Sequence, residues 1–209
     1  LGSALDALEL TTYDHEFVQV AEHVTGATVS TLDTSVSGLE SSNTFRWWLG
    51  GLIATAQEFS LLWAPTINSY KRFQPGSWAP TGIGWGRDNR TTGIRVPLSG
   101  PVSRRVENRL AGMDCNPYLG IAVSLACGYL GLMEEKRAGP SFKGDAYEGE
   151  EDIPRVMGDA LSLFEEAKAL HEVLGPDFAR VYTIVKRAEY EEFLHVISPW
   201  EREHLLLNV

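Results

Sequence analysis

Hydrophobic residues recur every three or four positions between residues 43 and 63, the spacing that places side chains on one face of a helix. The polar residues Ser41, Ser42 and Asn43 can cap the start of this helix, and Pro65 follows its last apolar position. The pattern therefore predicts an amphipathic helix over about 43–63. Its core-facing positions are Phe45, Trp48, Leu49, Leu52, Ile53, Ala56, Phe59 and Leu62.

After this helix the pattern changes to short segments with the residue preferences of strands, and helical spacing returns later. We expect one α+β domain in which the first helix and antiparallel strands form the layer that bears the site, backed by helices from 116 onward. The expected segments are a loop at 64–80, strands at 82–86, 91–98 and 103–109, a helix at 116–133, a loop at 139–152, helices at 153–173 and 177–197, and a short terminal helix.

The composition fits a folded domain that does not cross a membrane. Apolar residues make up 44% of the 209 residues, yet no apolar run approaches the roughly 20 residues of a transmembrane helix. Residues 1–30 also lack the order of a secretory signal. The two cysteines, Cys115 and Cys127, are too few for a disulfide framework and lack metal-site spacing, so we expect a cytoplasmic protein.

Charge is distributed unevenly in this chain, whose formal net charge is -10. Residues 1–64 carry a net charge of -7 and residues 134–209 of -8, whereas residues 65–133 carry +5. An anion site within an acidic protein is the simplest explanation. Nucleic acid is a poor candidate, because its binding usually needs a basic domain and the pI here is about 5.0.

Side-chain alternation places Arg105, Glu107 and Arg109 on one face of the last expected strand. Such a face is often only solvated, and this interpretation stays open. A second set, Arg90 and Arg95 on the preceding stretch, favours a binding site, because grouped cations repel one another unless anions join them. Arginine binds phosphate and carboxylate, and a carboxylate among arginines can hold a metal that bridges to phosphates. These are the parts of a phosphoryl-transfer site.

Four ordered motifs in this region resemble the C-terminal catalytic half of the glutamine synthetase superfamily: NSYKRFQPGSWAP, WGRDNRTTGIRVP, RRVENR and NPYL. The resemblance extends in weaker form over about 41–209. It implies the catalytic-domain fold of that family and a reaction in which ATP phosphorylates the side-chain carboxylate of glutamate and an amine displaces the phosphate. The implied cofactors are ATP and Mg²⁺ (or Mn²⁺), and the implied assembly is a homo-oligomer of stacked rings.

The resemblance also implies a role for each of six charged residues. By this resemblance Arg72 and Arg109 bind glutamate, and Arg90 holds the transferring phosphate. Arg95 and Arg105 bind nucleotide phosphates, and Glu107 is a metal ligand.

The loop from Pro75 to Pro80 departs from the ammonia-using members of the family, which have Pro-Gly-Tyr-Glu-Ala-Pro with a glutamate that binds and deprotonates ammonium. Here Trp78 replaces that glutamate. An indole cannot take the proton and offers an apolar, cation-attracting face, which suits an alkylamine or a polyamine. The loop therefore resembles that of the γ-glutamyl-amine ligases. The alternative is that Trp78 is a loop anchor packed on its own domain.

Residues 1–42 match the family poorly, because its other metal-binding glutamates, its Gly-Ser-x-x-His-x-His stretch and its small N-terminal β domain are not found there. We therefore divide the chain into this segment and a C-terminal part of the catalytic domain, 43–209, incomplete at its N-terminal side. The expected function is ATP-dependent joining of glutamate to an amine, with no activity expected of this chain alone. The alternatives are an ammonium-using glutamine synthetase and a non-catalytic, truncated binding or assembly module.

Overall fold

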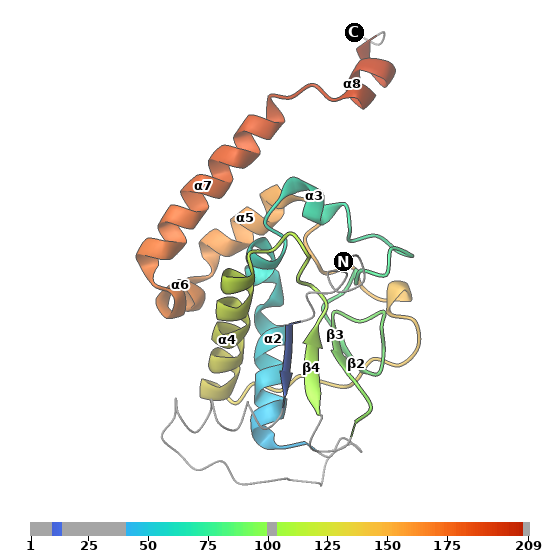
Figure 1. The fold of residues 1–209 in the computed structure, drawn as a ribbon, viewed down its shortest axis with the longest axis vertical. Coiled ribbons are helices and arrows are strands. Elements are labelled where there is room, and N and C mark those ends of the chain that lie inside the picture. Colours follow the sequence, from blue (N-terminus) through green and yellow to red (C-terminus); the bar gives the residue numbers. More distant parts are fainter. Residues whose placement is uncertain (1–9, 14–40, 100–103, 207–209) are drawn as a thin grey trace.

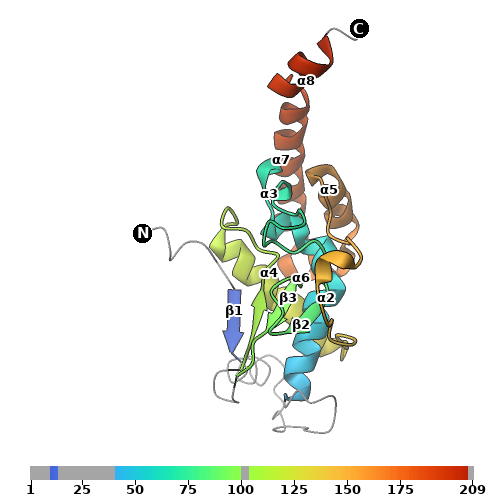
Figure 2. The same cartoon turned by 90° about the vertical axis from the view of Figure 1, so that its right-hand side faces the viewer.

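The computed structural model describes residues 10–13, 41–99 and 104–206, which form a small sheet beside a group of helices (Figure 1). The described strands follow the order β1-β4-β3-β2. Their bounds are Leu10–Tyr13 for β1, Trp85–Arg87 for β2, Ile94–Val96 for β3 and Arg105–Asn108 for β4. Helices α2 and α4 run alongside the sheet in both views (Figures 1 and 2). The α+β class is confirmed.

The three expected strands form two pairs, of which one is antiparallel as predicted, and β1 was not expected as a strand. β4 is antiparallel to both β1 and β3, but β2 and β3 are parallel, so the antiparallel prediction is wrong for that pair. Each of these two strands has only three residues. Parallel neighbours start at the same end of the sheet, so the connection at 88–93 must bring the chain back along the length of β2. Its six residues can span about 20 Å, which is enough for a strand this short.

Helix α2 (Asn43–Trp63) has the bounds that the hydrophobic pattern predicts, and the Ser42 side chain caps it by accepting from the backbone N–H of Phe45 at 3.1 Å. It packs against α4 (Pro117–Met133), which Asn116 caps. The two helices approach closely through glycines. A Cβ atom on Gly51 would lie 2.1 Å from a backbone oxygen of α4, so this contact excludes larger residues.

The C-terminal part contains α5 (Met157–Glu166), α6 (Lys168–Leu174), α7 (Pro176–Leu194) and α8 (Pro199–His204). The single helix expected over 153–173 is wrong, because it is two helices that meet at the non-helical residue Ala167. Phe164 and Leu170 are both fully buried. Residues six apart point about 120° from each other on one straight helix, so the break allows both to reach the core.

Two short helices lie in segments that were expected to be loops: α3 (Ile67–Tyr70) and the 3-10 helix η2 (Ala146–Glu148). Within the described residues, no helix combines the length and apolar character of a membrane span.

The sheet presents a buried apolar face and a polar face. Ile94, Val96 and Val106 are almost completely buried in the core. Arg95 and Glu107 alternate with them and therefore lie on the other side. This polar face and the loops at its edge carry the predicted site.

Candidate active site

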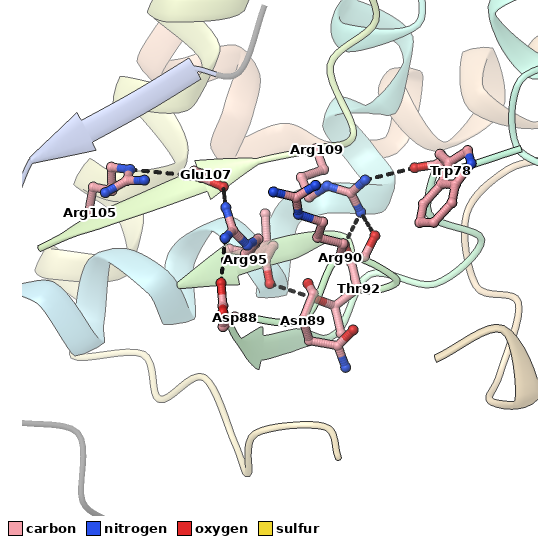
Figure 3. Close-up of polar contacts among 10 residues, drawn as sticks. Trp78, Asp88, Asn89, Arg90, Thr92, Arg95, Arg105, Glu107 and Arg109 are labelled. Carbon is pink, nitrogen blue, oxygen red and sulfur yellow. Dashed lines mark hydrogen bonds and ion pairs between the residues drawn. The ribbon is translucent and has the colours of Figure 1, made fainter. Parts of the chain in front are cut away.

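The centre of the polar face is a buried carboxylate held by arginines from two strands (Figure 3). Glu107 lies opposite Arg95 in the β3–β4 register. Its Oε2 accepts from Arg95 Nη1 at 2.5 Å, and its Oε1 accepts from Arg105 Nε at 2.9 Å. Arg95 Nη2 also donates to Asp88 after β2. The predicted nucleotide-binding arginines and the predicted metal ligand are thus brought together.

Ion pairs compensate the buried charges of this cluster. The Glu107 side chain is only 2% exposed, so its charge depends on the two guanidinium groups for compensation. Burial disfavours the charged form of Arg95, but hydrogen bonds to Glu107 and Asp88 outweigh burial and raise the pKa of Arg95. Arg95 therefore stays a cation, paired with both carboxylates.

A metal fits this cluster only with further ligands. Across residues 10–13, 41–99 and 104–206, no three His, Cys, Asp or Glu side chains are grouped as a metal site. Both oxygens of Glu107 already accept from arginines. Glu107 can serve as a metal ligand only together with groups outside the described residues, so its predicted role stays a prediction.

Arg109, just after β4, joins three other segments of the site. Its Nη2 donates to the carbonyl oxygen of Trp78 at 2.7 Å, and its Nη1 donates to those of Thr92 at 3.3 Å and of Arg90. Figure 3 shows the exposed side chain of Arg90 between Arg95 and Arg109. In this view Arg105, Arg95, Arg90 and Arg109 follow one another along the polar face, and we call these four residues the arginine row.

The Arg72 side chain contacts the backbone of Arg109 and of the residue after it. Its Nη2 donates to the carbonyl oxygen of Leu110 at 2.5 Å and its Nη1 to that of Arg109 at 3.5 Å. The guanidinium carbon lies 4.7 Å from the ring centroid of Phe73. Burial lowers the pKa of Arg72, and Asp114 opposes this effect. Both predicted glutamate-binding arginines thus also hold backbone carbonyls in place.

Trp78 is presented outward from its loop. Its side chain is 72% exposed, and its φ of 63° lies in the left-handed region that few non-glycine residues adopt. The indole buries little of its surface against the described residues, and the alternative of an anchor packed on its own domain stays open. An exposed indole at the end of the arginine row is available to a ligand.

Sequence reasoning missed two residues of this region. Tyr147, in the segment expected to be a loop at 139–152, donates its hydroxyl to the carbonyl oxygen of Ala79 at 3.0 Å. Asp88 pairs with Arg95. The available signals were the single acid within the stretch GRDNR and the aromatic residue in an acidic, glycine-rich segment.

The fold and this cationic face define an α+β domain suited to anionic ligands. The chain belongs to the glutamine synthetase family: the family described as "Glutamine synthetase, catalytic domain" matches residues 31–205. The match confirms the resemblance that the four motifs indicate.

Two curated relatives show the range of this family. The chain is 37% identical over 180 residues to the gamma-glutamylethanolamide synthetase of Streptomyces coelicolor, covering 86% of this chain and 39% of that protein. It is also 37% identical over 172 residues to type-1 glutamine synthetase 2 of Dictyostelium discoideum, covering 79% and 33%. The chain thus spans about two fifths or less of each relative.

A solved structure supports the same assignment. The chain is similar to a GmaS/ADP complex with a TM-score of 0.73 and 33% identity, covering 84% of this chain and 42% of that one. The likeness therefore holds for the fold as well as for the sequence.

Proposed function

We propose that the protein containing this chain is an ATP-dependent ligase that joins the γ-carboxylate of glutamate to an amine through a γ-glutamyl phosphate. Family membership supports the reaction class, and the row of arginines supports the handling of anionic groups. The observation that carries the choice of amine is the exposed indole of Trp78, where ammonia-using members have a glutamate.

ATP would supply the phosphoryl group, and a divalent ion such as Mg²⁺ or Mn²⁺ would balance its charge. In this proposal Arg95 and Arg105 bind nucleotide phosphates, and Arg90 holds the transferring phosphate. Glu107 keeps the first two arginines in register through its buried pairs. Preorganised cations of this kind stabilise the charge of a phosphoryl-transfer transition state. The ADP named in the GmaS complex fits this assignment.

Glutamate binding falls to Arg72 and Arg109 in this proposal. Three backbone carbonyls accept from Arg109, and in this proposal the positive charge of its guanidinium attracts the glutamate carboxylate. These carbonyl contacts fix the guanidinium before substrate arrives. A fixed guanidinium loses less conformational freedom when it binds a carboxylate.

Trp78 would select the nucleophile. An indole face attracts an alkylammonium group by cation–π and apolar contact, but it cannot take a proton from ammonium. The Streptomyces relative is named a gamma-glutamylethanolamide synthetase, and an ethanolamide is the amide of an alkylamine, which supports this choice. The Dictyostelium glutamine synthetase has the same 37% identity, so overall identity does not decide, and use of ammonium is the second candidate.

We further infer a cytoplasmic homo-oligomer, because family members assemble as stacked rings and the two cysteines, Cys115 and Cys127, are free thiols.

The test is a ligation assay with the full-length protein. ADP release should require glutamate and a nucleophile together, and mass spectrometry should identify the γ-glutamyl product. With ammonium, ethanolamine and putrescine supplied separately at equal concentration, an amine should give the highest kcat/KM. The highest value with ammonium would favour the second candidate, and no glutamate-dependent ADP release would contradict the ligase proposal.

A further inference from the structure

Three segments of the candidate site meet at two consecutive carbonyl groups. The carbonyl oxygen of Trp78 accepts from Arg109, and that of Ala79 accepts from the Tyr147 hydroxyl at 3.0 Å. Arg109 also holds carbonyls of the loop at 88–93. Each donor therefore fixes the loop that carries the indole from a different part of the chain.

The segment that carries Tyr147 is itself fixed to the loop at 88–93. The Asn89 side-chain amide donates to the carbonyl oxygen of Gly144 at 2.9 Å, and the backbone N–H of Ala146 donates to Thr91 Oγ1 at 2.8 Å. Thr91 Oγ1 donates to Asn89 Oδ1 at 2.7 Å, which joins these two contacts. The hydroxyl of Tyr147 is therefore presented from an anchored segment.

The receiving loop needs such support at this point. The Ser77 hydroxyl contacts the carbonyl oxygens of Arg72 and Gln74, both at 2.6 Å, so the first part of the loop is held internally. Trp78 follows with a φ of 63°, a conformation that costs free energy for a residue with a side chain. The contacts of Arg109 and Tyr147 to Trp78 and Ala79 stabilise this conformation.

We propose that Tyr147 is a positioning residue that sets the orientation of Trp78 and thereby the selectivity for the amine. The proposal rests on the proposed function, because it assumes that the indole contacts the nucleophile. Tyr147 acts through the backbone at Ala79 and not by contact with the reacting atoms.

The kinetic test compares Tyr147→Phe with the matched control Tyr182→Phe in the full-length protein. The Tyr182 hydroxyl also donates to a backbone carbonyl, that of Leu61 at 3.2 Å, but it joins α7 to α2. Tyr147→Phe should raise KM for the amine about 2- to 10-fold, the range for one lost hydrogen bond, and leave KM for ATP and glutamate within about two-fold. Tyr182→Phe should leave all three values within about two-fold.

An equal rise in all three KM values in Tyr147→Phe, or an amine KM no higher than in Tyr182→Phe, would overturn the proposal.

Hydrogen exchange of the full-length protein tests the positioning step without an activity assay. The backbone amides of Ser77 and Ala79 should exchange about 2- to 10-fold faster in Tyr147→Phe than in wild type or Tyr182→Phe. Unchanged exchange would show that Tyr147 does not position the loop. If the wild type uses no amine, the proposed function fails and the link to selectivity fails with it, whereas exchange still decides the loop contact.

Discussion

Replacing Glu107 with glutamine tests whether the buried ion pairs hold the polar face of the sheet together. The substitution keeps the size of the side chain and removes its charge. Arg95 and Arg105 then lose their shared counter-ion, although Arg95 keeps Asp88. Because Glu107 joins the two strands of the face, this change should weaken their pairing.

The expected loss follows from burial. Removing one partner of a buried pair costs about 3 to 5 kcal/mol, because the other charge stays buried without compensation. The side chains of Arg95 and Arg105 are 13% and 27% exposed, so both retain some hydration, and Arg95 keeps partial compensation from Asp88. We therefore expect Glu107→Gln to lower the free energy of unfolding by about 3 kcal/mol, the lower end of that range.

The assay is urea unfolding with a matched exposed pair as control. Arg155 Nη1 and Glu151 Oε2 lie 2.5 Å apart, the same atoms and distance as in the Arg95–Glu107 pair, but both side chains are more than 40% exposed. Glu151→Gln should cost less than about 1 kcal/mol. Equal losses for Glu107→Gln and Glu151→Gln would refute the argument that burial makes the site pair essential to the sheet.

Three further predictions concern packing, nucleotide binding and the exposed indole. Gly51→Ala should cost at least about 1 to 3 kcal/mol in thermal unfolding, since its Cβ would overlap the backbone of α4, whereas Gly84→Ala, with open space around it, should cost under about 0.5. Arg95→Ala should weaken ADP binding by about 1.5 to 3 kcal/mol in calorimetry. If the double variant Arg95→Ala, Arg105→Ala binds ADP as tightly as the wild type, the two arginines have a purely structural role. Trp78→Ala should change the free energy of unfolding by less than about 0.5 kcal/mol, because the indole is exposed, and a larger loss would indicate packing.

The helices that pack through one continuous face could be predicted from the sequence. The hydrophobic spacing, the polar cap and Pro65 are local signals, and α2 has the predicted bounds. The break at Ala167 could not be predicted in this way, because α5 and α6 each continue the helical pattern. Their separation follows from contacts made in three dimensions, which bury Phe164 and Leu170 together.

The candidate site shows the same limit. Strand alternation predicts that Arg105 and Glu107 share a face, and the structure pairs them. The contact of Tyr147 with Ala79 joins residues 68 positions apart, and no local pattern encodes it. The parallel direction of β2 and β3 likewise depends on how the short connection at 88–93 folds back.

The most direct test of the account is a competition between ammonium and an amine for the γ-glutamyl phosphate that we propose. Full-length wild-type protein and Trp78→Glu would each receive ATP, glutamate and equal concentrations of ammonium and putrescine or ethanolamine, and mass spectrometry would give the ratio of the two amides. We predict mainly the amine product from the wild type. Trp78→Glu should lower kcat/KM for the amine roughly ten-fold, with KM for ATP nearly unchanged. Mainly glutamine from the wild type, or an amine preference that Trp78→Glu leaves unchanged, would contradict the account.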